Sequence, residues 1–140
     1  MVEGKLRKAS QIEDGIITND KLATPATAFA PVPHDVAASR AIDGTVYQNT
    51  TGKTMVVVVN VRFDIDLVAG GDATIVANTD TMSPPNLAVA QVGTHTQAGG
   101  TLLTQYEALT FVVPDNYYYS ITSIVNGANA AVLFFWVEYY

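Results

Sequence analysis

The sequence has no cysteine, few charged residues and no long apolar run, and each shortage excludes a class of protein. Without cysteine the chain forms no disulfide, carries no thiolate nucleophile and builds no cysteine-based zinc site. Only 14% of the 140 residues are charged and 49% are hydrophobic, a composition that favours a folded domain over disorder. No uninterrupted apolar run comes near the roughly 20 residues that span a bilayer, and no apolar segment follows the early basic residues as a secretory signal requires. We therefore expect one folded domain with no membrane partner.

Basic residues are scarce beyond the first 22 positions. From Ala23 onward the chain has three basic and nine acidic residues, which account for the whole net charge of −6. Phosphate neutralisation needs clustered lysine and arginine, and the one such cluster, at residues 5–8, is short and terminal. The sequence therefore argues against a nucleic-acid partner.

The stretch at residues 55–67 has the two-residue period of a β-strand with one buried face. Every second residue from Met55 to Leu67 is apolar, while the opposite side begins with valine and turns polar at Asn60. Upstream, residues 45–48 predict a second strand. The polar, glycine-containing segment at 49–53 is short enough for a hairpin between the two.

The remaining sequence alternates short β-type stretches with turn formers. We predict further strands at 73–77, 87–92, 102–107, 109–113, 117–125 and 130–140, with a Gly/Thr-rich loop at 93–100. About eight short strands without a convincing helix predict an all-β fold, an antiparallel β-sandwich of jelly-roll-like type. Spacing does not fix strand order, so an immunoglobulin-like Greek key stays open.

Residues 1–38 have a different pattern from the rest of the chain. Isolated isoleucine and leucine residues stand among turn formers up to residue 22, and the Ala-, Thr- and Pro-rich stretch that follows favours an extended linker. We predict an extended N-terminal anchoring arm and linker at 1–38 and a β-sandwich domain at 39–140. The apolar residues of the arm gain burial only in a partner or at an oligomer axis, so we expect them to anchor the chain: Leu6, Ile12, Ile16, Ile17 and Leu22.

Both faces of the last predicted strand are apolar until Glu138. The outer face of a sandwich strand normally meets water and is polar, so the linker, a loop or a neighbouring subunit must cover this one. We expect a homo-oligomer with Phe134 and Trp136 in the subunit interface.

Residues that could carry catalysis or bind metal lack the matching motifs. His34 and His95 fall in a linker and a loop without ligand spacing, and no nucleophile-elbow motif is present, so we expect no enzyme, no metal and no cofactor. The aspartates at 64, 66, 72 and 80 could supply oxygens to calcium, but they lack the twelve-residue loop pattern, and a solvent face is the favoured interpretation.

Two surface patterns have structural alternatives. Tyr118 could stack on a sugar, although strand spacing places two of the three tyrosines at 117–119 on one face and one on the other, which favours half core and half surface. Asn49 begins a glycosylation sequon, but hairpin chemistry in the 49–53 connection is the favoured interpretation.

Three stretches of the β domain carry a family resemblance. The run SRAIDGTVYQNTTGK at 39–53, followed by a valine-rich strand, is similar to the start of a β domain recurrent in bacteriophage tail-fibre and other virion appendage proteins. Those domains later carry an F-x-V-P stretch followed by tyrosine, matched at 111–119, and end on an aromatic strand with Trp and Glu, matched at 136–138.

The arm resembles the same group. The sequence DGIITNDKLA at 14–23 is similar to the D-G-x-I-T-x-x-K-L-A units of phage fibre shafts, in which the apolar residues face a three-fold axis. Only one such unit is present, which favours a short spike, head fibre or capsid decoration protein over a long fibre.

The resemblance implies a non-enzymatic virion structural protein, most simply a homotrimer on the particle surface. Its arm would bind capsid or tail proteins of the same virion, and its β-sandwich knob would be exposed. The alternative is a carbohydrate- or host-receptor-binding module that recognises a host surface glycan through Tyr118 or through the loops at 78–86 and 93–101.

Overall fold

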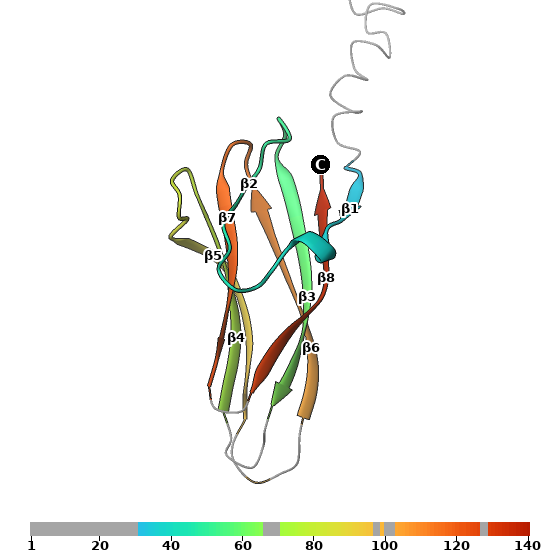
Figure 1. The fold of residues 1–140 in the computed structure, drawn as a ribbon, viewed down its shortest axis with the longest axis vertical. Helices are drawn as coiled ribbons and strands as arrows, with labels where there is room; N and C mark the ends of the chain where they lie inside the picture. The colour runs from blue at the N-terminus through green and yellow to red at the C-terminus, as the bar shows by residue number, and fades with distance from the viewer. Residues whose placement is uncertain (1–30, 66–70, 97–98, 100–102, 127–128) are drawn as a thin grey trace, which may run out of the picture. The chain divides into compact units, whose positions relative to one another are not determined.

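The structure, a computed structural model, describes residues 31–65, 71–96, 99, 103–126 and 129–140, and strands dominate them (Figure 1). All of these residues except Pro31 belong to the second of two units, Val32–Tyr140. Its elements are β1 (Pro33–Asp35), the short 3-10 helix η1 (Ala37–Ser39), β2 (Tyr47–Gln48), β3 (Met55–Ile65), β4 (Gly71–Asp80), β5 (Leu87–Thr96), β6 (Leu103–Val113), β7 (Tyr118–Val125) and β8 (Ala130–Tyr139).

The strands form two four-stranded sheets, ordered β1-β8-β3-β6 and β2-β7-β4-β5, with every neighbouring pair antiparallel. The first strand pairs with the last, the second with the seventh, the third with the sixth and the fourth with the fifth. Such nested pairing is a long hairpin rolled into two sheets, which is the jelly-roll arrangement. The predicted all-β antiparallel sandwich is confirmed, and the observed order differs from the immunoglobulin order of strands.

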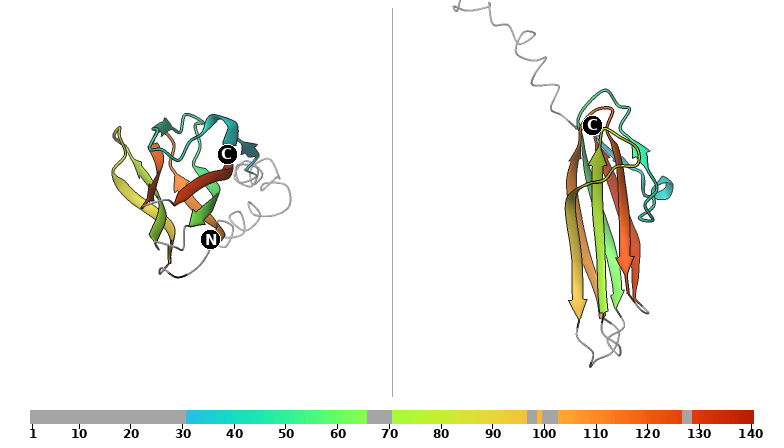
Figure 2. Two further views of the ribbon diagram at one scale, coloured as in Figure 1. Left: turned by 60° about the horizontal axis from the view of Figure 1, so that its bottom comes forward. Right: turned by 90° about the vertical axis from the view of Figure 1, so that its left-hand side faces the viewer.

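The core lies between the two sheets, which Figure 2 shows from two further directions. Burial along β3 alternates over its full length, so the predicted two-residue period of this strand is confirmed between Met55 and Ile65. Full burial of one large apolar side chain stabilises a fold by about 1.5–3 kcal/mol. The largest fully buried residues are Trp136, Tyr119, Phe63, Met55, Ile65, Ile75 and Ile121.

The predicted domain boundary after residue 38 is wrong. Residues 33–35 form β1 against the end of β8, with Pro33 opposite Tyr139, and Val36 N donates to Trp136 O at 3.0 Å. Proline lacks an N–H and is tolerated here because β1 is an edge strand. The stretch at 32–38 is therefore part of the sandwich and not a linker.

The predicted hairpin at 45–53 is also wrong, because β2 and β3 lie in opposite sheets and the segment between them crosses from one to the other. Asn49 fixes this crossing. Its Nδ2 donates to the carbonyl oxygens of Lys53, Val113 and Pro114 at 2.8, 2.9 and 3.1 Å. Its Oδ1 accepts from the backbone and hydroxyl of Thr51. Asn49 is buried and fully engaged, so it is not available for glycosylation, but it fixes a crossing between the sheets and not the predicted hairpin.

Three strands are longer than predicted, and the first is β4, which covers Gly71–Asp80 where the sequence predicts 73–77. β5 continues to Thr96, through part of the predicted glycine-rich loop, and β6 is one strand where the sequence predicts two. At Gly93 an added Cβ would lie 2.8 Å from Ala73 O and 2.6 Å from the Thr74 hydroxyl. Glycine here allows β5 to approach β4 closely and is not a turn signal.

Candidate interaction surface

The outer face of the β2-β7-β4-β5 sheet is largely polar. On β4 the residues that alternate with the buried positions include Thr74, Asn78 and Asp80. On β7 the half-buried residues of the same face include Tyr118 and Thr122, which pair in register with Asp80 and Val76. This face has the character expected of a sandwich surface in water.

The outer face of the β1-β8-β3-β6 sheet is largely apolar, although Asn60, Arg62 and Asp64 of β3 also lie on it. We call its exposed part the aromatic face and define it by Tyr106, Val112, Val132, Phe134 and Phe135, from β6 and β8. Phe134 is 61% exposed and Tyr106 is 54% exposed. Between these two rings β3 contributes Asn60 and Arg62, and the half-buried outer valines at 56 and 58 lie further along the same strand.

A bulge in β8 places Phe134 on this face. Asn60 of β3 is opposite Phe135, the next residue Val61 is opposite Leu133, and Phe134 falls between the two pairs. The extra residue reverses the alternation, because a bulge sets two residues of one strand against one of the other. Leu133 and Trp136 consequently both pack on the core side.

The predicted interface role of Trp136 is therefore wrong. Trp136 is 0% exposed, and its ring contacts those of Tyr47 and Tyr119 at centroid distances of 5.9 and 6.4 Å. Strict alternation along the strand predicts that Trp136 and Phe134 share a face, but the bulge places Trp136 in the core and Phe134 on the outer face. Phe134 remains accessible, and its role in an interface stays a prediction.

The aromatic rings of this face form a connected group. The ring of Phe134 meets that of Tyr106 edge-on, with centroids 5.4 Å apart and planes at 74°, and it lies 6.3 Å from that of Phe135. Tyr106 belongs to β6 and Phe134 to β8, so the ring contact passes over β3, the strand between them. Edge-to-face pairs hold aromatic rings in defined orientations.

The charges on this face are balanced. Among the described residues of β3, β6 and β8, the outward-facing charges are Arg62 and Asp64, which form an ion pair at 2.9 Å. Asp64 also accepts from the Thr104 hydroxyl at 3.1 Å. At the sheet edge, the Asp35 carboxylate accepts from Ala37 N at 3.1 Å.

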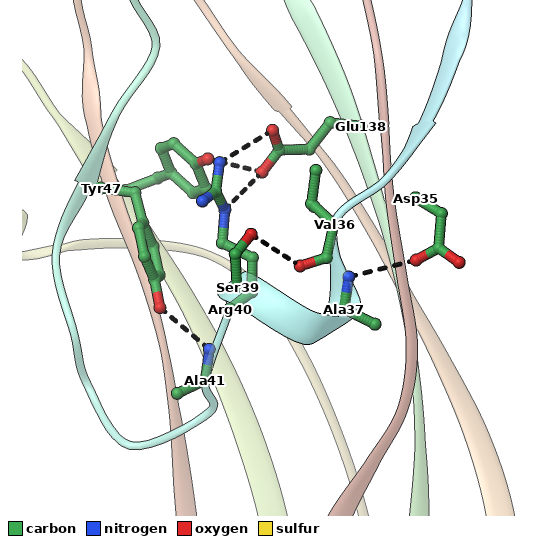
Figure 3. Close-up of polar contacts among 9 residues, drawn as sticks. Asp35, Val36, Ala37, Ser39, Arg40, Ala41, Tyr47 and Glu138 are labelled. Atoms are coloured by element: carbon green, nitrogen blue, oxygen red, sulfur yellow. Dashed lines mark hydrogen bonds and ion pairs between the residues drawn. The ribbon is translucent and has the colours of Figure 1, made fainter.

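A buried ion pair fixes the segment between β1 and β2 to the sandwich (Figure 3). Arg40 Nε and Nη2 donate to the two carboxylate oxygens of Glu138 at 2.9 and 3.1 Å, and Tyr119 Oη donates to Glu138 Oε1 at 2.6 Å. The guanidinium also lies over the Tyr47 ring, 4.5 Å from its centroid, and Tyr47 Oη accepts from Ala41 N. We call this group the Arg40 clamp.

The electrostatics of the Arg40 clamp follow from its burial. Glu138 is 3% exposed. Burial, and secondarily the hydrogen bond to Glu138, raises the pKa of Tyr119 well above its ordinary value. Burial alone would lower the pKa of Arg40, but the hydrogen bond to Glu138 and the neighbouring charges outweigh it and the pKa is raised. Both groups thus keep their protons at neutral pH and donate to a carboxylate, which suits a structural clamp.

The histidines and aspartates that the sequence offers as metal ligands or catalytic residues do not come together in one site. His34 stacks on Tyr140, with centroids 4.1 Å apart, and His95 contacts Asp72 in the other sheet. Asp80 accepts from the Thr81 hydroxyl. Asp66 lies outside the described residues, as do the five arm residues predicted to anchor. Within the ranges that the structure describes, no three histidine or acidic side chains gather as metal ligands would.

Tyr118 points away from the core, whereas Tyr117 and Tyr119 pack against it or within it. The prediction of two tyrosines on one face and one on the other is confirmed. Tyr118 is half-buried, and in the β2-β7-β4-β5 sheet it lies opposite Gln48 on one neighbouring strand and Asp80 on the other. Sugar binding by Tyr118 stays a prediction.

Sequence reasoning missed most of the aromatic face and the whole Arg40 clamp. The sequence feature that pointed to the aromatic face was the apolar character of both sides of the last strand. This feature identifies Phe134, but it says nothing of Tyr106, which lies on another strand.

In the described part of the chain no helix is long and apolar enough to cross a membrane. Comparison with models of known protein families and with curated proteins finds no match for this sequence.

Proposed function

We propose that the protein is a non-enzymatic structural component of a virus particle, a capsid decoration, head-fibre or short tail-fibre protein that acts as a homotrimer. The observation that carries the proposal is the apolar outer face of the β1-β8-β3-β6 sheet. A sandwich that works alone in water has a polar outer face on both sheets, and an exposed patch of this kind is typical of a protein that works in an assembly.

The extent of the sandwich supports attachment to a particle through the residues that precede it. Val32, the first residue of the sandwich, is hydrogen-bonded to Tyr140 in both directions, at 3.1 and 3.3 Å. Among the described residues the eight strands run from Pro33 to Tyr139, so we infer that residues 1–31 serve another role. We propose that their apolar residues bind capsid or tail proteins while the sandwich is exposed as a knob.

The polar groups buried in the sandwich support a structural role. Glu138, Arg40 and Tyr119 satisfy one another, and Asn49 is occupied by backbone groups. Catalytic acids and bases need access to a substrate, and these groups are engaged within the fold.

The test is incorporation into particles. An antibody raised against residues 32–140 should detect the protein in density-banded virus particles from a lysate of the source, on the particle surface in immunogold images. Added to particles that lack it, the full chain should co-sediment with them, and a variant without residues 1–22 should stay folded and remain in the supernatant. Recovery of the protein only in the particle-free fraction would refute the proposal, and co-sedimentation of the truncated variant would refute the anchoring role of the arm.

A second candidate, a carbohydrate-binding module, is favoured by the outward position of Tyr118 beside Asp80. Binding on a glycan array that is lost in Tyr118→Ala and kept in Ile124→Ala, a substitution on the same outer face, would support it. Loss of binding in both variants, or in neither, would count against a site at Tyr118.

A further inference from the structure

We propose that the aromatic face is the surface through which copies of this chain bind one another, with Phe134 as the central anchor. This names the subunit contact of the proposed function and rests on its oligomeric part alone. It does not depend on attachment to a particle.

The first argument is the state of Phe134 in the isolated chain. The bulge leaves Phe134 without an opposite residue on β3, and its side chain is 61% exposed. The edge-on contact with Tyr106 at 5.4 Å restricts the ring before any partner arrives. An exposed aromatic residue that is already oriented loses little freedom on binding, and aromatic anchors of this kind dominate interface energies.

The second argument is size. With about 150–200 Å² of surface for each residue of this type, the five residues of the aromatic face expose on the order of 450 Å². This lies within the range of the largest patch on a typical monomer, roughly 300–600 Å². It is also more than half of the roughly 800 Å² that each partner contributes to an interface of standard size. The neighbouring outer valines of β3 and the rim of the sheet can supply the remainder.

The third argument selects a second copy as the occupant. The chain carries a net charge of −6, so two copies repel each other over most of their surfaces. The aromatic face is where this repulsion is weakest, because its charges are the balanced pair Arg62 and Asp64. Across a symmetry axis, Arg62 of one copy can also face Asp64 of another, so the pair is complementary to itself. A strongly basic partner would instead be drawn to the acidic remainder of the surface.

The experiment compares two matched substitutions in the full chain. Phe134→Ser removes the proposed anchor, and Ile124→Ser removes an apolar side chain of similar exposure, 55%, from the outer face of the opposite sheet. Light scattering after gel filtration should give an oligomer for the wild type and for Ile124→Ser. It should give a monomer for Phe134→Ser at the same concentration, because loss of a central aromatic anchor weakens association by about 30-fold or more. Unchanged near-UV circular dichroism confirms that both variants stay folded.

Thiol labelling provides a second measurement, because the natural chain has no cysteine. In Val132→Cys, a substitution on the aromatic face that keeps Phe134, the single thiol should react slowly with a maleimide at high protein concentration and rapidly after dilution below the dissociation constant. The thiol of Ile124→Cys should react rapidly at both concentrations. Such a dependence on concentration is specific to contact between copies.

Three outcomes would overturn the inference. A wild-type monomer well above the micromolar range would do so, since that range marks the weak end of standard interfaces. An oligomer that persists in Phe134→Ser would place the contact elsewhere. Protection of the Val132→Cys thiol at every dilution would mean that residues 1–31 of the same chain cover the face. In each case particle binding can still be measured, so failure of the inference is distinguishable from failure of the proposed function.

Discussion

Substitution of Arg40 with methionine provides the sharpest test of how the first part of the sandwich is held. Methionine keeps an aliphatic side chain of similar length but removes both hydrogen bonds to Glu138. The carboxylate is then left with the hydroxyl of Tyr119 as its donor in the clamp. Because Glu138 is 3% exposed, water cannot replace the lost guanidinium without opening the structure.

The expected loss of unfolding free energy is about 3 kcal/mol at neutral pH. Removing one partner of a buried ion pair typically costs about 3–5 kcal/mol. The lower end applies here because the Arg40 side chain is 21% exposed and its charge is partly screened by solvent. A loss of this size is a large share of the total stability of a domain, about 5–15 kcal/mol.

The assay is urea unfolding followed by fluorescence of Trp136, the one tryptophan of the chain, which is buried in the core. Adding Glu138→Gln to Arg40→Met should recover about 1–2 kcal/mol, because a neutral amide is cheaper to bury than an unpaired carboxylate and Tyr119 can still donate to it. Arg62→Met, which breaks the exposed pair with Asp64, is the matched control and should change stability far less. Equal losses in Arg40→Met and Arg62→Met, or a double variant less stable than Arg40→Met, would refute the reasoning.

Three further predictions concern other buried contacts, each measured by the same urea unfolding. Tyr119→Phe should lose about 2 kcal/mol at neutral pH, since it removes a short hydrogen bond to a carboxylate. The pKa of Tyr119 is raised above its ordinary value of 10.0, so above that pH the unfolded chain loses the tyrosine proton while the folded protein keeps it, and wild-type stability should fall. The difference in unfolding free energy between the wild type and Tyr119→Phe should therefore narrow. A difference that stays constant up to about pH 11 would contradict this reasoning. Asn49→Ala should lose about 3 kcal/mol because it leaves backbone carbonyls, including that of Val113, without their donor, and a loss below about 1 kcal/mol would show that water replaces it. Gly93→Ala should lose about 1–3 kcal/mol, because its Cβ would lie 2.8 Å from Ala73 O, whereas Gln91→Ala on the same strand should be nearly neutral.

The parts of the fold that the sequence predicts are those controlled by local periodicity. Alternation from Met55 to Ile65 identified β3 and its buried face, because one side of that strand is in the core throughout. β1 was missed because Pro33 and its neighbours have the composition of a linker, and only pairing with the distant residue Tyr139 makes them a strand. The prediction of a hairpin at 45–53 is wrong for a similar reason, because a short polar connection can join two strands of one sheet or cross between two sheets, and only the tertiary structure decides which.

The candidate surface was partly predictable. Phe134 could be named because an apolar outer face on the last strand contradicts the usual pattern. The bulge that separates Phe134 from Trp136 depends on the register against β3, which no local sequence pattern encodes. Arg40 and Glu138 lie at opposite ends of the β domain in sequence, and only the pairing of the first strand with the last brings them together.

That nested pairing also sets the order in which the fold can close during translation. β4 and β5 are neighbours in the sequence and can pair as soon as both have been synthesised, whereas β1 has to wait for Val137, Glu138 and Tyr139. Pairing therefore proceeds from the middle of the sandwich sequence outward, with ever longer loops to close. Docking of β1 and formation of the Arg40 clamp are then the last steps. Any assembly step that requires the completed β1-β8-β3-β6 sheet can consequently begin only after Tyr139 has been synthesised, and its rate has the folding of the whole domain as its upper limit.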